Sequence, residues 1–509
     1  MRRYRIISQW VFGIFFLFLF LNTRYLGQDV IPYPVNAFFR IDPLAAISSM
    51  IASRKVLTFF WPLMILLPVT FLFGRFFCGW ICPMGGCLDV VGRYSKVRTP
   101  APAGPFYRTR EILLVFLLVA SIFSINLAGN FDPLSLLIRS LAMGVVPPFE
   151  RAATAFFDTA YRIGEPVRSI TEPLYGFLHN GLLSFNPPVF RQVPLFLSLF
   201  IAVILLELYQ RRFWCRNLCP LGALLGWFSF LSPLGLRVRS DGCTGCFDCL
   251  NVCRMGALTT ESPRSIRPAD CTLCYDCVDL CGDELVSHRT VQTEVKSVSQ
   301  VFSLSRRQFI ASAGVGVILP LTVGTSIRAD SLGQYIIRPP GAAAENEFLA
   351  LCLRCGECMR VCLTNGLQPT LLETGLEGIW SPILVSRTGY CEYSCTLCGQ
   401  VCPTNAIENL DSVRKKAVTI GTAIINKNTC IPFIRPEECI VCEEHCATPE
   451  KAIVFDRTFV QGPEGTAQVM QPRVIEKLCT GCGICEYKCP LEGESAIRIV
   501  RDGEDRARS

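Results

Sequence analysis

Short cysteine runs recur along this chain, and they constrain its fold more than any other feature. The first two read CTGCFDCLNVC and CTLCYDCVDLC, so both follow the spacing C-x2-C-x2-C-x3-C. The chain has 29 cysteines but only 3 histidines. Disulfide scaffolds are usually short secreted chains, and zinc sites often mix cysteine with histidine. The runs therefore favour all-thiolate binding of iron–sulfur clusters.

This first pair of runs predicts two [4Fe–4S] clusters in an α+β ferredoxin-like domain at residues 236–295. In the bacterial pattern of this kind, the fourth cysteine of each run ligates the cluster of the other run, which links the two halves of the fold. One predicted ligand set is Cys243, Cys246, Cys249 and Cys281, and the other is Cys271, Cys274, Cys277 and Cys253.

The pattern returns in expanded form at residues 335–509, where we predict a second α+β ferredoxin-like domain. Four groups of four cysteines provide ligands for four more [4Fe–4S] clusters, so the chain is expected to hold about six. The groups are Cys352, Cys355, Cys358 and Cys362; Cys391, Cys395, Cys398 and Cys402; Cys430, Cys439, Cys442 and Cys446; and Cys479, Cys482, Cys485 and Cys489.

Nested exchange of the last cysteine is the predicted pairing of these four groups. The outer pair would join Cys352, Cys355 and Cys358 with Cys489, and Cys479, Cys482 and Cys485 with Cys362. The inner pair would join Cys391, Cys395 and Cys398 with Cys446, and Cys430, Cys439 and Cys442 with Cys402. Haem is not expected, because the three histidines provide neither a C-x-x-C-H motif nor pairs of haem ligands.

Apolar runs predict that residues 1–230 form an α-helical membrane bundle with four spans. The runs lie at about residues 6–21, 56–73, 111–129 and 193–208, and the mean hydropathy of the chain is +0.38. Basic residues flank these runs, so the net charge of +7 indicates membrane topology rather than nucleic-acid binding. The charge pattern places the N-terminus and the first ferredoxin-like domain in the cytoplasm.

The expected membrane segment contains an internal repeat. RIDPLAAI and NFDPLSLL share the letters D-P-L, and RFFCGWICPMG and RFWCRNLCPLG share C-x-x-x-C-P. Asp42 and Asp132 are expected to cap short helices, with a role near a quinone headgroup as the alternative. The cysteines of the second motif are Cys78, Cys82, Cys215 and Cys219, and Cys87 is interpreted as structural.

These four cysteines are a tentative additional metal site. Converging thiolates would bind a [4Fe–4S] cluster or a soft metal such as Cu(I), or act as a dithiol relay, and buried structural thiols are the alternative. Arg75, Arg212 and Arg216 flank the motifs and are expected to lower the thiol pKa values.

The letters LSRRQF introduce an internal twin-arginine export signal at residues 303–329. Arg306 and Arg307 precede a weakly apolar run at about residues 309–327, which is the expected fifth span. No A-x-A site occurs near Arg328–Asp330, so an uncleaved anchor is favoured. An ordinary fifth span, or a decayed signal with a cytoplasmic tail, is the alternative. Export of a domain already loaded with clusters explains the position of a signal so late in the chain.

The motifs together resemble two known families. Residues 1–290 resemble NapH/MauN-type membrane ferredoxins, and residues 305–509 resemble NapG/MauM-type twin-arginine-exported ferredoxins. The resemblance implies a fusion of two usually separate proteins in the bacterial inner membrane, with the last domain in the periplasm. Its implied function is electron transfer from membrane quinol to a periplasmic reductase or cytochrome, with a cytoplasmic electron donor as a further candidate partner.

Two alternatives to a quinol dehydrogenase module remain open at this point. One is a maturation or reductive-activation factor for a periplasmic metalloenzyme, and the other is an electron-transfer subunit of a larger respiratory complex. The sequence contains no nucleophile constellation, phosphate loop or dinucleotide fingerprint, so we assign no catalytic residues.

Overall fold

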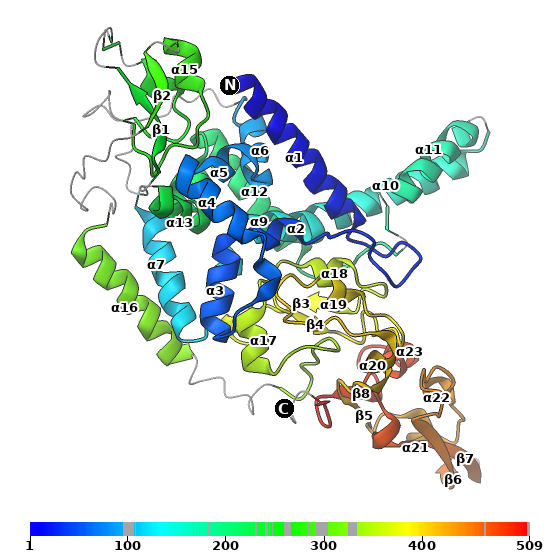
Figure 1. The fold of residues 1–509 in the computed structure, drawn as a ribbon. Helices are drawn as coiled ribbons and strands as arrows, with labels where there is room; N and C mark the ends of the chain where they lie inside the picture. Colours follow the sequence, from blue (N-terminus) through cyan, green and yellow to red (C-terminus); the bar gives the residue numbers. More distant parts are fainter. Residues whose placement is uncertain are drawn as a thin grey trace. The chain divides into compact units, whose positions relative to one another are not determined.

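The computed structural model describes most of the chain, and Figure 1 shows its course. The described residues are 1–94, 106, 108–165, 167–181, 183–184, 186–229, 232–239, 243, 245–246, 248–258, 266–282, 285–290, 304–323, 333–462 and 465–505. They form two compact units, each built from separate stretches. Unit 1 comprises Met1–Phe20, Asn36–Gly144 and Pro194–Gly324, and unit 2 comprises Leu21–Val35, Val145–Val193 and Thr325–Ser509.

Unit 1 is mainly helical. Its helices are α1 (Arg2–Asn22), α2 (Ala37–Arg40), α3 (Pro43–Ser53), η1 (Thr58–Phe60), α4 (Leu63–Phe73), α5 (Phe76–Trp80), α6 (Pro83–Val91), α7 (Thr109–Ile122), α8 (Ala128–Phe131), α9 (Pro133–Arg139), η2 (Ser140–Val145), α12 (Val193–Tyr209), η3 (Trp214–Leu218), α13 (Pro220–Ser229), α14 (Asp248–Val252), α15 (Asp276–Cys281) and α16 (Arg306–Val323). Helices α3, α4 and α7 pack around α13, and α16 lies along α7, where Gly316 faces Val119 (Figure 1).

The prediction of four spans plus a fifth signal-anchor span is wrong. Among the described residues only α1, with 21 residues, is both long and apolar enough to cross a bilayer. The second expected span is interrupted at Pro62, leaving the 11 residues of α4, and the third is reduced to the 14 residues of α7. A helix of 11 residues extends only about 16 Å, roughly half the hydrocarbon thickness of a bilayer. Part of the expected fifth span, and the segment Arg328–Asp330, lie outside the described residues.

The D-P-L motifs begin two buried helices, as predicted. The side chain of Asp42 accepts hydrogen bonds from the backbone N–H groups of Leu44 and Ala45, and Asp132 accepts one from Ser135. Each aspartate precedes a proline at the first helical position, which has no N–H to satisfy. Burial raises the pKa of Asp42, and the neighbouring carboxyl group of Asp132 raises it further.

The remaining described part of unit 1 is a small antiparallel sheet with two short helices. Strand β1 (Leu234–Val238) pairs with β2 (Val286–Thr290), with Leu236 opposite His288. Figure 1 shows α15 beside this sheet. Leu236, Leu273, Tyr275 and Val286 are buried together with Cys277, so apolar packing here surrounds a predicted cluster ligand.

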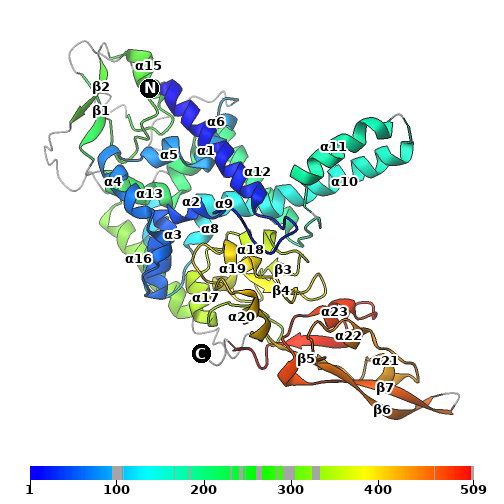
Figure 2. The ribbon, with the colours of Figure 1, turned by 45° about the vertical axis from the view of Figure 1, so that its right-hand side comes forward.

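Unit 2 combines a helical hairpin with small antiparallel sheets. Its helices are α10 (Val146–Ile163), α11 (Val167–Gly181), α17 (Glu345–Leu351), α18 (Glu357–Arg360), η6 (Leu376–Gly378), α19 (Leu397–Val401), α20 (Ser412–Ala417), α21 (Ile431–Ile434), α22 (Val441–Glu444), η7 (Glu476–Leu478) and α23 (Ile484–Lys488). Helices α10 and α11 lie side by side as a hairpin (Figure 2).

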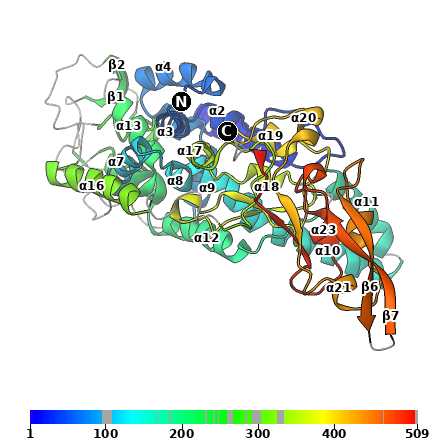
Figure 3. The same ribbon diagram turned by 90° about the horizontal axis from the view of Figure 1, so that it is seen from below.

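Three two-stranded sheets complete unit 2. Strand β3 (Leu367–Pro369) pairs with β4 (Pro382–Leu384), and β5 (Thr422–Ile425) pairs with the distant β8 (Ile497–Val500). Strands β6 (Ile453–Gly462) and β7 (Gly465–Val474) form a long hairpin, which is prominent in Figure 3. Strand β5 precedes Cys430 and β8 follows Cys489, so their pairing holds together the ends of the stretch that carries the third and fourth cysteine groups.

Two substitutions of Asp42 should show separately how its capping hydrogen bonds and its buried carboxyl group affect the stability of the protein. Asp42→Asn keeps a capping oxygen but cannot ionise, whereas Asp42→Ala should unfold more easily than Asp42→Asn by about 1 kcal/mol because the cap is lost. The raised pKa means that the folded state favours the neutral carboxyl group. The stabilising contribution of that group is therefore complete below the ordinary carboxyl pKa of about 3.9 and is lost as pH rises through the folded-state pKa.

Thermal unfolding followed by circular dichroism checks this prediction. Asp42→Asn should be more stable than the unaltered protein at neutral pH, and the difference should shrink as pH falls towards about 4. A difference that does not change with pH would show that ionisation of Asp42 does not matter for folding.

Candidate metal centres

Each regular cysteine run forms a loop that curls around its own centre. In such loops, the third and fifth residues have positive φ, as Leu273 (φ 51°) and Tyr275 (φ 61°) do between Cys271 and Cys277. Arg354 and Gly356 repeat this conformation in the run that begins at Cys352, and Gly481 and Gly483 repeat it in the run that begins at Cys479. Successive reversals of this kind turn backbone N–H groups to one side, which suits an anionic centre.

The first ferredoxin-like segment brings its cysteines together as predicted. Cys253, Cys271, Cys274 and Cys277 line one cavity, together with apolar side chains such as Leu236 and Met255. Burial raises the pKa of Cys281, and the thiols of Cys246 and Cys243 raise it further, so Cys281 lies beside the opposite run. The fourth cysteine of each run thus lies with the first three of the other.

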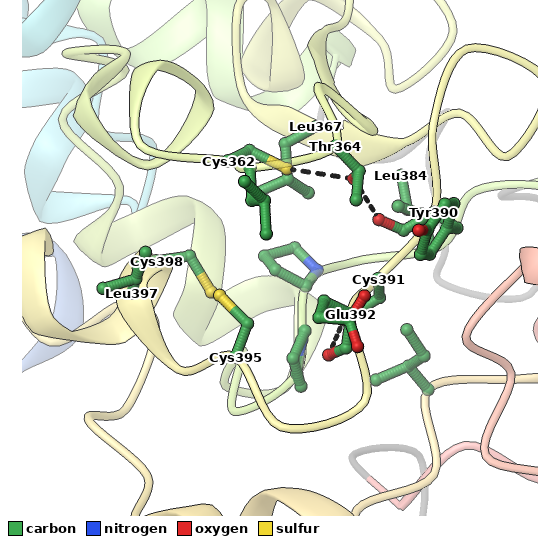
Figure 4. A pocket seen from close by; sticks show the side chains of 14 residues that line it. Cys362, Thr364, Leu367, Leu384, Tyr390, Cys391, Glu392, Cys395, Leu397 and Cys398 are labelled. Atoms are coloured by element: carbon green, nitrogen blue, oxygen red, sulfur yellow. Dashed lines mark hydrogen bonds between the residues drawn. The ribbon is translucent and has the colours of Figure 1, made fainter. Parts of the chain in front are cut away.

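In unit 2 the groups pair consecutively, so the predicted nested pairing is wrong. Figure 4 shows one cavity in which Cys362 faces Cys391, Cys395 and Cys398. A second cavity is lined by Cys489 together with Cys430, Cys439 and Cys442. The first group therefore exchanges its last cysteine with the second group, and the third exchanges with the fourth.

The two remaining sets agree with consecutive pairing. Burial raises the pKa of Cys358 well above its ordinary value, and Cys355, Cys352 and Cys402 raise it further. Burial likewise raises the pKa of Cys485, and its neighbouring thiols are Cys482, Cys479, Cys442 and Cys446. Helix α18 packs on α19 and α22 packs on α23, so each pair of groups forms one local module.

The donor sets consist of thiols, the ligands that hold iron–sulfur clusters. Among the described residues, no three His, Cys, Asp or Glu side chains converge closely enough to hold one ion. Zinc requires sulfur at about 2.3 Å from the metal, whereas a cubane spreads its four ligand sulfurs around a larger body. Backbone N–H groups also point at ligand sulfurs, as from Ala257 to Cys253 (3.2 Å) and from Ile407 to Cys402 (3.4 Å).

The C-x-x-x-C-P cysteines also come together, although they lie far apart in sequence. Cys78 on α5, Cys82 before α6, Cys215 on η3 and Cys219 before α13 are all buried. Burial raises the pKa of Cys219 well above its ordinary value, and the thiols of Cys215, Cys78 and Cys82 raise it further. Cys87 is only partly buried; burial raises its pKa, and its charged neighbour is Glu207.

The arginines lower these thiol pKa values as expected, but burial outweighs them, so the net shift is upward. Burial raises the pKa of Cys215 to about 12, and the opposing effect of the Arg212 guanidinium is smaller. The same balance raises the pKa of Cys82. A low-pKa, solvent-accessible thiolate is therefore not what the structure provides at this site, and the thiols would need a metal to become thiolates.

Sequence reasoning missed the aspartate that organises the arginines around this site. Asp89 accepts hydrogen bonds from Nε and Nη2 of Arg212 at 2.9 and 2.8 Å, and it forms ion pairs with Arg5 and Arg254 at 3.0 Å each. Burial alone would raise the pKa of Asp89, but the guanidiniums of Arg212, Arg254 and Arg5 together hold it well below its usual range. The sequence feature that could have indicated this role is the position of Asp89, an acidic residue seven positions after Cys82 in an otherwise apolar helix.

Consecutive pairing can be tested by counting iron in double variants. Cys355→Ala and Cys402→Ala should each remove one cluster, and the double variant should lose no more than either single variant, about four iron atoms per chain. The matched control is Cys355→Ala with Cys489→Ala, which should lose about eight because the two cysteines belong to different clusters. Nested pairing would reverse these two results, and iron and acid-labile sulfide assays decide between them.

Comparison with known proteins agrees with the cysteine chemistry. A family model described as a 4Fe-4S binding domain matches residues 56–102 and 192–238. The methylamine utilization ferredoxin-type protein MauM of Methylorubrum extorquens is 33% identical over 207 residues, which cover 39% of this chain and 90% of that protein. The ferredoxin-type protein NapG of Escherichia coli is 34% identical over 194 residues, covering 37% of this chain and 78% of that protein.

A shorter relative also matches the chain. The ferredoxin-type protein NapF of Escherichia coli is 31% identical over 165 residues, covering 31% of this chain and 84% of that protein. No solved structure matches the chain significantly. Since the chain covers nine-tenths of MauM at one-third identity, it belongs to the family of MauM- and NapG-type iron–sulfur ferredoxins.

Proposed function

We propose that this chain takes electrons from a quinol and passes them, one at a time, to an exported redox enzyme. The observation that carries the proposal is the exchange of the fourth cysteine between consecutive runs, which puts candidate cluster sites into adjacent pairs. Membership of the ferredoxin family supports the electron-transfer part. The quinol, the exported reductase or cytochrome, and a cytoplasmic electron donor are the partners we propose.

The residues of each site have two tasks in such a relay. They bury the ligand sulfurs, as at Cys355 and Cys358, and they direct N–H groups at them, as at Cys402. When bound, a [4Fe–4S] cluster supplies a centre that gains or loses one electron. Burial and N–H···S hydrogen bonds tune the potential at which it does so, and they keep water away from the sulfurs.

We further propose that the chain joins a NapH/MauN-type half to its MauM/NapG-type half and acts at the bacterial inner membrane. Ser305 and Gln308 cap the start of α16 reciprocally: Gln308 N–H donates to Ser305 Oγ (3.3 Å), and Ser305 N–H donates to Gln308 Oε1 (3.1 Å). Arg306 and Arg307 are exposed in the first turn. They are therefore accessible to an export machinery, which supports an internal signal for residues 335–509.

A maturation factor that exchanges thiols with an exported metalloenzyme is supported less well. The exposed fractions of Cys78, Cys82, Cys215 and Cys219 are only 4–8%. Thiol–disulfide exchange requires an accessible thiolate, and burial at these positions acts against both requirements. An electron-transfer subunit of a larger complex would share the chemistry proposed here but would copurify with a catalytic subunit.

Reduction by a quinol tests the main proposal. We expect a short-chain quinol, added anaerobically to the purified oxidised chain, to bleach the iron–sulfur absorbance without any partner enzyme. Cys402→Ala should lower the bleaching by the share of one cluster, because it removes a ligand of the set with Cys352. The matched control is Cys87→Ala, which should bleach like the unaltered protein.

Dithionite provides the reference for this measurement, because it needs no specific binding site. If dithionite bleaches the clusters fully and the quinol leaves them oxidised, the quinol donor is wrong. A partner enzyme that is synthesised but inactive in a deletion strain, together with that result, would favour maturation instead.

Helix α1 should attach the chain to the membrane. Among the residues that the structure describes it is the one apolar helix of bilayer length, and Val11 and Ile14 are 56% and 62% exposed on it. Val11→Glu combined with Ile14→Glu should move the protein into the soluble fraction after carbonate extraction, because charged groups are costly in hydrocarbon. Val413→Glu, which alters a side chain of unit 2 that is 77% exposed, is the control and should not change the distribution. Retention of the double variant in the membrane would exclude α1 as the anchor.

A further inference from the structure

We infer that the two C-x-x-x-C-P segments together hold one additional iron–sulfur cluster, ligated by Cys78, Cys82, Cys215 and Cys219. The site would lie beside the one formed by Cys253, Cys271, Cys274 and Cys277. This inference goes beyond the proposed function, because it does not depend on a quinol, on export or on any partner.

Neither segment can hold a cubane by itself. The first match to the 4Fe-4S binding model, residues 56–102, contains three cysteines, and the second, residues 192–238, contains two. A cubane with all-thiolate ligation needs four. The third cysteine of the first segment, Cys87, lies on α6 with Glu207 as its charged neighbour, whereas the thiols that act on Cys219 are those of Cys215, Cys78 and Cys82. A complete ligand set therefore requires two cysteines from each repeat.

The two repeats are joined by exchanged arginines at the same positions of the motif. Arg212, three residues before Cys215, donates from Nη1 to the carbonyl oxygen of Cys78 at 2.8 Å. Arg75, three residues before Cys78, donates from Nη2 to the carbonyl oxygen of Cys215 at 3.5 Å. Both arginines are at most 1% exposed. Each repeat thus holds the ligand-bearing backbone of the other, as a pseudo-twofold site requires.

The glycine of C-P-x-G explains how the arginines fit. A Cβ added at Gly85 would lie 2.8 Å from the carbonyl oxygen of Cys78 and 3.3 Å from Nη1 of Arg212. At Gly222 it would collide with Nη2 of Arg75. In both repeats the glycine therefore leaves room for the guanidinium of the opposite repeat.

The second cysteine of each motif has the backbone conformation of the ferredoxin-type ligands. Cys82 has φ −59° and ψ 118°, and Cys219 has φ −74° and ψ 109°. Cys402 and Cys489, which also precede proline, have φ −66°, ψ 117° and φ −53°, ψ 124°. Gly222 donates its N–H to the sulfur of Cys219 at 3.3 Å, and Gly85 does the same for Cys82. These bonds favour a negatively charged sulfur, as in a bound cluster.

The predicted neighbouring ferredoxin site lies directly against this one in unit 1. Gly79, next to Cys78, packs so closely on Thr272 that a Cβ would collide with the Thr272 carbonyl oxygen. Trp80 donates from Nε1 to the carbonyl oxygen of Leu273 at 3.1 Å. Arg216, next to Cys215, is 3% exposed and lies against Gly256, three residues after Cys253. The C-x-x-x-C-P site and the neighbouring ferredoxin site are therefore separated only by these buried, directly contacting segments.

Metal analysis of the full chain, purified anaerobically, tests the inference. Six clusters account for about 24 iron atoms and seven for about 28. We expect about 28 in the unaltered protein, and we expect Cys78→Ala and Cys215→Ala each to lose about four iron atoms and four sulfides. The double variant should lose the same four, because the two cysteines serve one cluster. Cys87→Ala is the matched control and should lose none.

Electron paramagnetic resonance of the reduced protein gives a second readout. Two reduced clusters separated only by these segments broaden each other's signals, so the signal of the neighbouring cluster should narrow in Cys78→Ala. The inference is overturned if the two single losses add in the double variant, if zinc or copper is lost in place of iron, or if the unaltered protein holds only about 24 iron atoms. The count in the unaltered protein decides the matter even if a variant fails to fold.

Discussion

The structure depends on one constraint: many sulfur atoms are buried in sets of four. The members of each set come from separate parts of the chain. A free thiol in such a place stays neutral, since burial penalises the thiolate, and this is why the pKa values of Cys355, Cys358 and Cys485 are raised so strongly. A metal cluster removes that penalty by binding the charged form. Cluster binding and folding are therefore coupled at each of these sites.

Local backbone geometry brings three sulfurs of a set together, and tertiary structure adds the fourth. Alternate positive φ values at Leu273 and Tyr275 curl the run around a centre, and this happens within seven residues. The fourth sulfur comes from another run, so it depends on packing of one short helix on another, such as α18 on α19. The irregular groups, which begin at Cys391 and Cys430, show that four sulfurs can converge without this regular loop.

Buried charge is the second organising element, and it is concentrated in unit 1. Asp89 joins Arg5, Arg212 and Arg254, and Asp270 lies against Arg110 and Arg267. Removing one partner from a buried pair of this kind typically costs about 3–5 kcal/mol, because a charge is left without compensation. The arginines of unit 1 also hold backbone groups in place. Arg212 donates to the carbonyl oxygen of Cys78 and Arg75 to that of Cys215, and the two cysteines belong to different repeats.

The sequence alone determined the residue chemistry: which cysteines are candidate ligands, the exchange between Cys253 and Cys281, and the caps at Asp42 and Asp132. These follow from short-range spacing, which the chain cannot alter. The sequence did not determine which of four similar runs exchange cysteines, since Cys362, Cys402, Cys446 and Cys489 occupy equivalent positions. It also suggested membrane spans where Pro62 and the end of α7 limit the helices. Tertiary packing alone decided these points, because hydropathy and spacing do not specify which distant segments make contact.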